Sequence, residues 1–291
     1  MDDADLLVVT TAIEYYQQPN IIVTVHGNDT DLLVLLVHYF GASTSDRKLL
    51  LKTKTASWDI GKLVLAINNE VFHPRFLALH ALSGCDTTSR TYGKGKDKFY
   101  NVDKENTRYW EAVDMFYDAE ADKESITAAG EIVFLTVFDA DDSISTLDLL
   151  RAKHYEGKTG KATALVKAQS LPPTSDAASF HALRAYLQTQ VWMGNTRLEP
   201  IYFGFHTKSV QGNNMMLPTT MQWEMAPDTL LNIIHCGCKG ACDMKKCTCY
   251  KADIPCRLFC TNCNDISCEN IVSSSLNLSN DHDEIELDTA I

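Results

Sequence analysis

Nine of the ten cysteines lie within residues 236–268, and their crowding is the strongest chemical signal in the chain. Thiolates bind zinc tetrahedrally, so three zinc ions offer about twelve ligand places. Nine cysteines fill these places if six bind one ion each and three bridge two ions. The spacing therefore predicts about three structural zinc ions, held without histidine. The predicted ligands are Cys236, Cys238, Cys242, Cys247, Cys249, Cys256, Cys260, Cys263 and Cys268.

The alternative for these nine cysteines is a disulfide-bonded knot. Nine is an odd number, the sequence opens without a signal peptide, and thiols in the cytosol or nucleus stay reduced. The thiolates of a C-x-C step can share a metal ion, but they cannot easily join each other. Zinc is therefore favoured over disulfides. The tenth cysteine, Cys85, stands in a different segment, where packing is favoured over coordination.

A second group of candidate residues consists of aspartates in the N-terminal part. A β-branched run at 21–25 predicts a strand, and Asp29 and Asp31 follow it. Parallel sheets place their sites beyond the carboxyl ends of the strands, and carboxylate oxygens suit Mg²⁺ or Mn²⁺. The D-x-D pair is therefore a candidate catalytic metal site, against the alternative of a capped turn.

More candidates follow about fifty residues later in the chain. An apolar helix expected at 74–83 is followed by Gly84, Cys85 and Asp86, and Asp86 is a third candidate metal ligand. The basic stretch after it forms either a phosphate contact or a solvated loop. Its candidate contacts are Gly93, Lys94, Gly95 and Lys96. The histidines His26, His38, His73 and His80 are expected in the core or on the surface rather than as ligands.

The helices and strands that must position these residues differ along the chain and divide it into regions. Helices are expected at 3–17, 58–67 and 74–83, with strands at 21–25 and 49–53, which predicts an α/β domain with a parallel sheet over 1–105. Residues 106–194 are expected to be mainly helical, with 131–138 of either type and a helix capped by Thr174 or Ser175 running to Trp192. A loosely structured connector, 195–234, leads to the zinc module, 235–270, and an acidic tail, 271–291, expected to be disordered.

The cysteine pattern C-x-C-x3-C-x4-C-x-C-x6-C-x3-C-x2-C-x4-C resembles the tesmin-type CXC domain over about an eighth of the chain. That family consists of nuclear DNA-binding and chromatin-associated modules with a three-zinc, nine-cysteine core. The resemblance implies a nuclear protein with DNA as its partner. In this module Lys245, Lys246 and Tyr250 are the expected DNA contacts, although basic and acidic residues nearly balance. A protein-interaction or purely structural role is the alternative.

The order of the aspartates and the glycine turn resembles flap-endonuclease-like nucleases of the PIN-like superfamily over about the first 100 residues. In that family the motifs D-x-D and G-[CS]-D carry metal-binding aspartates, and a G-x-G turn binds the DNA backbone. The resemblance implies that Asp29, Asp31 and Asp86 are catalytic metal ligands and that the turn at 93–96 contacts phosphates. It also makes Asp3 and Asp5 weaker candidate ligands, because they match the family's acidic helix.

Two departures from the nuclease pattern bear on activity. The family's first strand, with its aspartate, lies upstream of the acidic helix, whereas here the sequence starts at that helix. The domain is therefore expected to be incomplete at its N-terminus, as a fragment or as a truncated domain. In addition, Thr87, Thr88 and Ser89 stand where an aromatic residue commonly follows the third aspartate.

Composition sets the outer bounds on function. The apolar content of 45% supports folded cores, and no apolar run approaches the about 18 residues that a membrane span needs. A net charge of −12 disfavours loose coating of nucleic acid, so binding must come from local basic patches. Protein partners are expected through the acidic tail or the helical region.

These observations predict a divalent-metal-dependent, structure-directed nuclease with a DNA-binding zinc module, in an architecture that resembles transposon-derived genes. The alternative is a nuclear DNA- or chromatin-binding or interaction protein in which the α/β domain is inactive.

Overall fold

The architecture is that of a computed structural model with two compact units, one within residues 1–161 and 166–224 and one holding the described residues of 225–291. Apolar side chains form the core of the first unit, and cysteines form the core of the second. The structure describes residues 3–19, 21–40, 48–67, 73–159, 168–210, 213–222, 236–239, 242, 247–251, 256, 260, 262–263 and 268–270. No helix in these ranges combines the length and the apolar character that crossing a bilayer requires.

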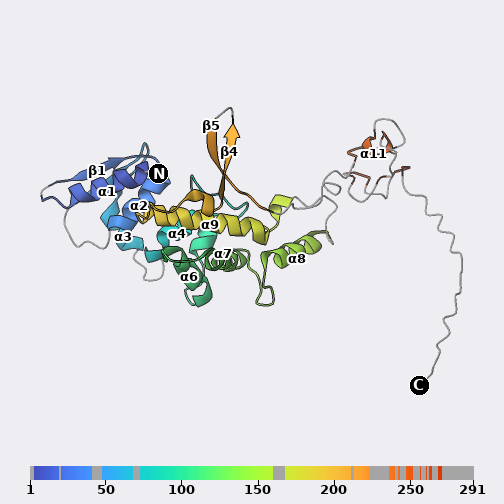
Figure 1. Cartoon of the computed structure of the whole chain (residues 1–291), viewed down its shortest axis with the longest axis horizontal. Helices are drawn as coiled ribbons and strands as arrows, with labels where there is room; N and C mark the ends of the chain where they lie inside the picture. Colours follow the sequence, from blue (N-terminus) through green and yellow to red (C-terminus); the bar gives the residue numbers. More distant parts are fainter. Residues whose placement is uncertain are drawn as a thin grey trace, which may run out of the picture. The chain divides into compact units, whose positions relative to one another are not determined.

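The N-terminal part of the first unit is a small mixed sheet with three helices (Figure 1). Strands β1 (Val23–His26) and β2 (Leu49–Lys52) pair in parallel, and helix α2 (Thr30–Phe40) makes the crossover that parallel pairing needs. Strand β3 (Ser57–Asp59) pairs with β2 in the antiparallel direction. The other helices are α1 (Ala4–Tyr16) and α3 (Ile60–Ile67).

The expected parallel pairing therefore holds for β1 and β2, whereas β3, which was not expected as a strand, makes the sheet mixed. A tight turn at 53–56, closed by the Thr53 amide donating to the Ala56 carbonyl at 2.9 Å, returns the chain onto β2. Trp58 then pairs with Leu51 in the sheet, and the helix expected from residue 58 begins at Ile60. A mixed α/β arrangement is confirmed for this part of the chain.

Helices make up most of the remaining first unit, as the sequence predicts. They are α4 (Phe76–Ser83), α5 (Lys96–Tyr100), α6 (Thr107–Asp114), α7 (Lys123–Val137), α8 (Leu147–Thr159) and α9 (Ser175–Trp192). Single 3-10 turns lie at His73–Arg75, Met115–Tyr117, Ala168–Ser170 and Pro200–Tyr202. The segment 131–138, left open between helix and strand, is helical through Val137.

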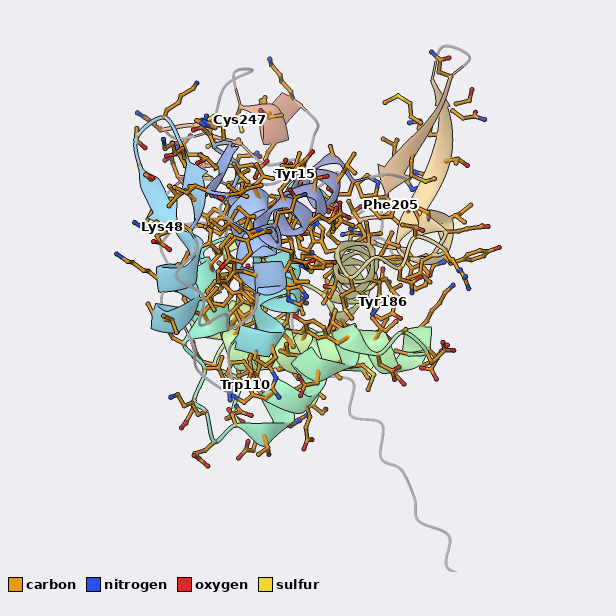
Figure 2. All side chains as sticks on the ribbon, turned by 90° about the vertical axis from the view of Figure 1, so that its left-hand side faces the viewer. Tyr15, Lys48, Trp110, Tyr186, Phe205 and Cys247 are labelled. Atoms are coloured by element: carbon orange, nitrogen blue, oxygen red, sulfur yellow. The ribbon has the colours of Figure 1, made fainter. Side chains whose placement is uncertain are left out.

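Helix α9 is the central element of this unit and runs beside α4 and α7 (Figure 1). The expected cap is confirmed, because the Thr174 hydroxyl accepts a hydrogen bond from the Ala177 amide at 3.1 Å. Apolar and polar side chains of α9 are buried alike; Tyr186 is 1% exposed and lies inside the packed unit (Figure 2). Buried polar groups must be paired. Gln190, for example, donates to the Phe116 carbonyl at 3.0 Å.

The closest approach of α7 and α9 occurs at Gly130. A Cβ atom there would lie 2.4 Å from the Cβ of Ala182, so Gly130→Ala is expected to cost about 1–2 kcal/mol of unfolding free energy, with helix propensity recovering part of the overpacking. Gly157→Ala in α8 is the control, because a Cβ there meets nothing within 4 Å, and it should gain up to about 1 kcal/mol. Urea unfolding curves measure both. Equal shifts of the two variants would contradict this packing.

The segment expected to be a loose connector contains a β-hairpin. Strands β4 (Phe205–Val210) and β5 (Asn213–Pro218) pair along their whole length, from Phe205 with Pro218 to Val210 with Asn213. The hairpin projects from the helical part (Figures 1 and 2). Its methionines Met215 and Met216 are exposed, which explains why no apolar alternation marks these strands in the sequence.

The second unit is built around its cysteines. Its one helix among the described residues is α11 (Thr248–Lys251). Eight cysteines are buried in one cluster, and Cys238 packs against it. Lys245, Lys246 and the tail at 271–291 lie outside the described residues.

Candidate metal centres

The cysteines of the second unit converge as a metal cluster requires. Three groups of four have sulfur atoms that all lie within 4.8 Å of one another. Tetrahedral Zn–S bonds of about 2.3 Å place neighbouring sulfurs about 3.8 Å apart. The observed Sγ–Sγ distances include 3.7 Å, 3.8 Å, 3.9 Å and 3.6 Å. The groups are Cys236, Cys242, Cys247 and Cys256; Cys236, Cys249, Cys256 and Cys260; and Cys242, Cys256, Cys263 and Cys268.

The described cysteines form no disulfide bond, so the cluster can bind zinc rather than hold a knot. Burial and hydrogen bonding to Cys260 together raise the pKa of the Cys249 thiol to about 12. Such a thiol stays protonated at neutral pH unless a cation is present, and a coordinating metal removes the proton outright. The chemistry of the donor set therefore fits zinc.

The three groups overlap, which indicates shared ligands. Cys256 belongs to all three groups, and Cys236 and Cys242 belong to two each. Cys238 belongs to none of them, but it lies beside the cluster. Burial raises the pKa of its thiol, and hydrogen bonds with Cys236 and Cys247 raise it further.

Hydrogen bonds around the cluster hold its loops and its sulfurs. The Tyr250 amide donates to Cys247 Sγ at 3.5 Å, and Asn270 Nδ2 lies 3.6 Å from Cys256 Sγ. Such donors orient metal-bound thiolates in known sites. The ring of Tyr250 is 48% exposed, so it covers the cluster only in part. The other proposed DNA contacts of this module lie outside the described residues.

The aspartates of the first unit come from three different chain segments. Asp3 caps α1, accepting from the Asp5 amide at 3.0 Å. Asp29 precedes α2 and accepts from the Asp31 amide at 2.9 Å. Asp86 lies exposed in the loop after α4. The sequence predicts these positions at a strand end and at two helix ends.

Asp5 is the one of these carboxylates on which the others act. Burial raises the pKa of Asp5 above its ordinary value of 3.8, and the charges of four neighbours raise it further. The neighbours are Asp29, Asp3, Asp31 and Asp86.

The carboxylates do not form a tight cage. Among the described residues, only cysteines supply three or more ligand atoms within 4.8 Å of one another. Mg²⁺ usually keeps several waters and takes one or two protein carboxylates together with substrate phosphates. Among the described residues, the carboxylates are therefore not arranged as a dehydrated ion would need.

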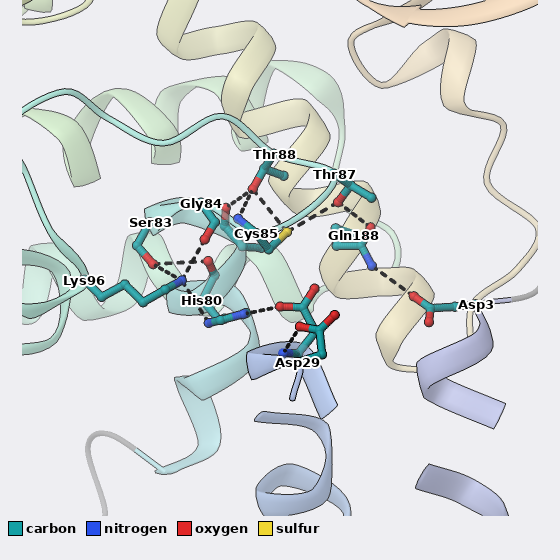
Figure 3. Close-up of polar contacts among 12 residues, drawn as sticks. Asp3, Asp29, His80, Ser83, Gly84, Cys85, Thr87, Thr88, Lys96 and Gln188 are labelled. Atoms are coloured by element: carbon teal, nitrogen blue, oxygen red, sulfur yellow. Dashed lines mark hydrogen bonds and ion pairs between the residues drawn. The ribbon is translucent and has the colours of Figure 1, made fainter. Parts of the chain in front are cut away.

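His80 connects the aspartates to the interior, a role that the sequence analysis missed. Its Nε2 lies 2.7 Å from Asp31 Oδ1, and both residues are buried (Figure 3). Lys96 Nζ lies 3.0 Å from His80 Nδ1. An ammonium group only donates, so Nδ1 accepts and the neutral imidazole donates from Nε2 to Asp31. Asp31 is therefore held by one oxygen.

Lys96 points into the protein. Its ammonium group meets three acceptors, which are His80 Nδ1, Ser83 Oγ at 3.4 Å and the Gly84 carbonyl at 2.7 Å (Figure 3). Burial lowers the pKa of Lys96. These contacts use the three donors that an ammonium group carries. The predicted phosphate contact of Lys96 is not tested by this arrangement, but it would require the side chain to leave these partners.

The rest of the turn at 93–96 is also anchored. Gly93 has φ 71°, a left-handed conformation that glycine adopts without cost. Lys94 Nζ lies 3.3 Å from Asp139 Oδ2 and 4.9 Å from the ring centre of Phe138. Gly95 precedes α5 in extended conformation. Phosphate binding by these residues stays a prediction.

Threonines hold the loop that carries Asp86. Thr88 Oγ1 donates to the Ala81 carbonyl at 2.6 Å and accepts from the Cys85 amide at 3.0 Å. Thr87 donates to Gln188 Oε1 at 2.6 Å, and Gln188 Nε2 donates to Asp3 at 3.4 Å (Figure 3). Gln188 of α9 thus ties two of the aspartate-bearing segments together. Cys85 lies half-buried against the core, as expected.

Searches of protein-family models, curated proteins and solved structures found no match to the chain. The resemblance to flap-endonuclease-like nucleases therefore gains no support from relatives or from fold. The possible zinc-binding cluster is compatible with a CXC module on its geometry alone.

Proposed function

We propose that the chain is a zinc-stabilised nucleic-acid-processing protein in which the aspartates of the α/β part hold a divalent ion for phosphodiester hydrolysis. The proposal is supported by the pKa of Asp5, which is raised by burial and then by the charges of Asp29, Asp3, Asp31 and Asp86. Carboxylates without a cation repel, so their charges near Asp5 favour a bound ion. Cleavage of flapped and single-stranded DNA in Mg²⁺ or Mn²⁺ by the full chain tests it.

The zinc module would hold three ions through nine thiolates. The overlap of the sulfur groups supports Cys236, Cys242 and Cys256 as bridging ligands, each shared by two ions. Cys238, beside Cys236 and Cys247, then completes the first group in place of Cys256. Every ion has four sulfurs in this assignment. The singly bound ligands are Cys238, Cys247, Cys249, Cys260, Cys263 and Cys268.

The acidic site consists of Asp3, Asp5, Asp29, Asp31 and Asp86, and its residues would have different roles. When bound, a divalent ion activates water and neutralises charge at the scissile phosphate. Asp31 is fixed by His80 through one oxygen, which leaves its second oxygen free of that contact. Asp29 and Asp86 stand on the loops that follow β1 and α4. Lys96 keeps His80 in the tautomer that donates to Asp31.

DNA binding by the zinc module would localise the protein to chromatin in the nucleus. Reversing the charges of Lys245 and Lys246 to glutamate is expected to weaken DNA binding for all sequences and to flatten its salt dependence by about two units of slope. Fluorescence anisotropy over a salt series measures both. The control is the same change at Lys48 and Lys62 in the first unit. Unchanged affinity and slope would exclude these phosphate contacts.

The wide spacing of the carboxylates favours a second candidate, a catalytically inactive protein that binds nucleic acid or a protein partner. The inactive protein and the enzyme differ in one measurable respect, which is metal-dependent cleavage. The inactive protein binds substrate without metal-dependent cleavage, whereas the enzyme releases product.

A further inference from the structure

A cavity of about 220 Å³ lies beside the segment that follows Asp86 in the chain. One wall is the loop from Ser89 to Tyr92, and the other is α9 with His181 and Arg184. Arg90 and Arg184 line it, and no carboxylate does among the described residues. Two cations without an acid indicate a pocket for an anion.

Arg184 is the buried cation of this cavity, with 3% of its surface exposed. Its Nη1 donates to the carbonyls of Thr219 at 2.5 Å and Gly204 at 3.3 Å. Its Nε has no hydrogen-bond partner in the described part of the chain, and no ion pair of Arg184 is found there. A buried charge without a counter-charge is costly, so a native chain keeps one where a ligand supplies the charge.

The surrounding groups leave Arg184 uncompensated. Burial lowers the pKa of Arg184, with no carboxylate contributing. His181 Nε2 lies 2.9 Å from the Leu82 carbonyl, and burial lowers the pKa of this imidazole to about 4. His181 is therefore neutral at pH 7 and donates to Leu82. The buried charge in the lining belongs to Arg184 alone.

The rest of the lining is polar on one side and apolar on the other. Ser89, Thr91 and Thr220 supply hydroxyl groups, and exposed Arg90 adds a second guanidinium, the group that pairs best with phosphate oxygens. The apolar side consists of Phe134, Pro173, Ala177 and Ala178. Pockets that enclose a whole drug-sized ligand measure about 300–1,000 Å³. This smaller cavity fits a phosphoryl group and leaves the remainder of its carrier outside.

Chain connectivity links this pocket to the acidic site. Asp86 and Ser89 are three residues apart, so their Cα atoms lie within about 11 Å of each other. The loop folds back closely, because a Cβ at Gly84 would lie 2.9 Å from Arg90 Cα. Tyr92 is 60% exposed next to the pocket wall, where its ring can stack on a base.

We propose that this pocket, formed by Arg90 and Arg184, binds a phosphoryl group of a nucleic-acid strand beside the acidic site. That the phosphoryl group belongs to a nucleic-acid strand rests on the proposed function. That the pocket binds a phosphoryl group does not. Free phosphate and a strand share the chemistry, so the experiment uses both.

The test is calorimetric titration of the zinc-loaded full chain with inorganic phosphate, without added divalent metal. Arg90→Gln and Arg184→Gln are each expected to weaken phosphate binding about ten- to a hundredfold, since each removes a charged hydrogen-bond donor. Arg197→Gln is the matched control, because Arg197 is exposed and outside the pocket. Arg184 is buried, so Arg184→Gln can also disturb the fold. Arg90 is exposed, and Arg90→Gln therefore tests the pocket without this complication.

Displacement then identifies the carrier. Single-stranded oligonucleotides with hydroxyl or phosphorylated 5′ ends are expected to displace phosphate from the wild type and to bind Arg90→Gln more weakly than the wild type. No phosphate binding, or equal binding by Arg90→Gln and Arg197→Gln, overturns the pocket. Phosphate binding that no oligonucleotide displaces overturns the assignment to nucleic acid. Intact phosphate binding without any cleavage would count against the proposed function alone.

Discussion

Replacing Cys256 by serine is expected to release at least two of about three zinc ions from the full chain. Cys256 lies in all three sulfur groups, and in the proposed cluster it bridges two ions. Structural zinc contributes about 10–16 kcal/mol of apparent binding free energy, which a core of cysteines cannot replace. The second unit is therefore expected to unfold around the lost ions. Elemental analysis after gel filtration measures zinc per chain.

Two further serine variants control this result. Cys247→Ser removes a ligand that belongs to a single group and should release about one ion. Cys85→Ser, in the first unit, should release none. Equal zinc contents in all three variants would contradict a shared cluster. A wild-type mass that shows four disulfides would exclude the zinc assignment altogether.

Replacing Asp86 or Asp31 by asparagine is expected to lower metal-dependent cleavage by about 10²–10³-fold, because a metal-bound carboxylate supplies several kcal/mol of transition-state stabilisation. The fold should survive, since a neutral amide replaces one of several repelling charges. Cleavage rates on flapped DNA, with thermal unfolding of the same samples, measure both effects. Asp142→Asn is the control, because Asp142 is exposed and outside the acidic site.

Asp5→Asn separates repulsion from chemistry. The folded-state pKa of Asp5 is raised, so its charge destabilises the folded chain above that pKa and the penalty fades as Asp5 is protonated. Asp5→Asn should therefore raise the melting temperature at pH 7 and lose this advantage below pH 3.8. A lower melting temperature at pH 7 would contradict mutual repulsion among the aspartates.

Local signals located the helices α1, α3, α4 and α9 and two of the three strands of the mixed sheet, but they did not locate α2, α5, α6 or α8. The capping residue Thr174 predicted the start of α9, because a cap acts within one element. β3 was missed because its pairing is decided by the turn at 53–56 rather than by its own residues. The hairpin β4–β5 was missed because exposed strands carry no alternating pattern.

The candidate site residues were likewise predicted where the signal is local and missed where it depends on distant partners. Cysteine spacing predicted the metal cluster, since nine thiols in a short segment have little choice of partners. Sequence also placed the aspartates at element ends, and the charges of four of them raise the pKa of Asp5. His80 and Arg184 carried no signal, because their roles depend on partners 49 and 35 residues away, Asp31 and Thr219. Lys96 looked like a surface cation, but its acceptors lie inside the protein.

Metal-dependent DNA cleavage by the zinc-loaded full chain is the most direct measurement of function. The protein is incubated with a flapped duplex and with a single strand, first without divalent metal and then over a range of Mg²⁺ or Mn²⁺. The acidic site predicts product that appears only with the metal and that Asp86→Asn fails to form. No product from the wild type in either metal, or equal product from Asp86→Asn, would contradict a catalytic role for the aspartates.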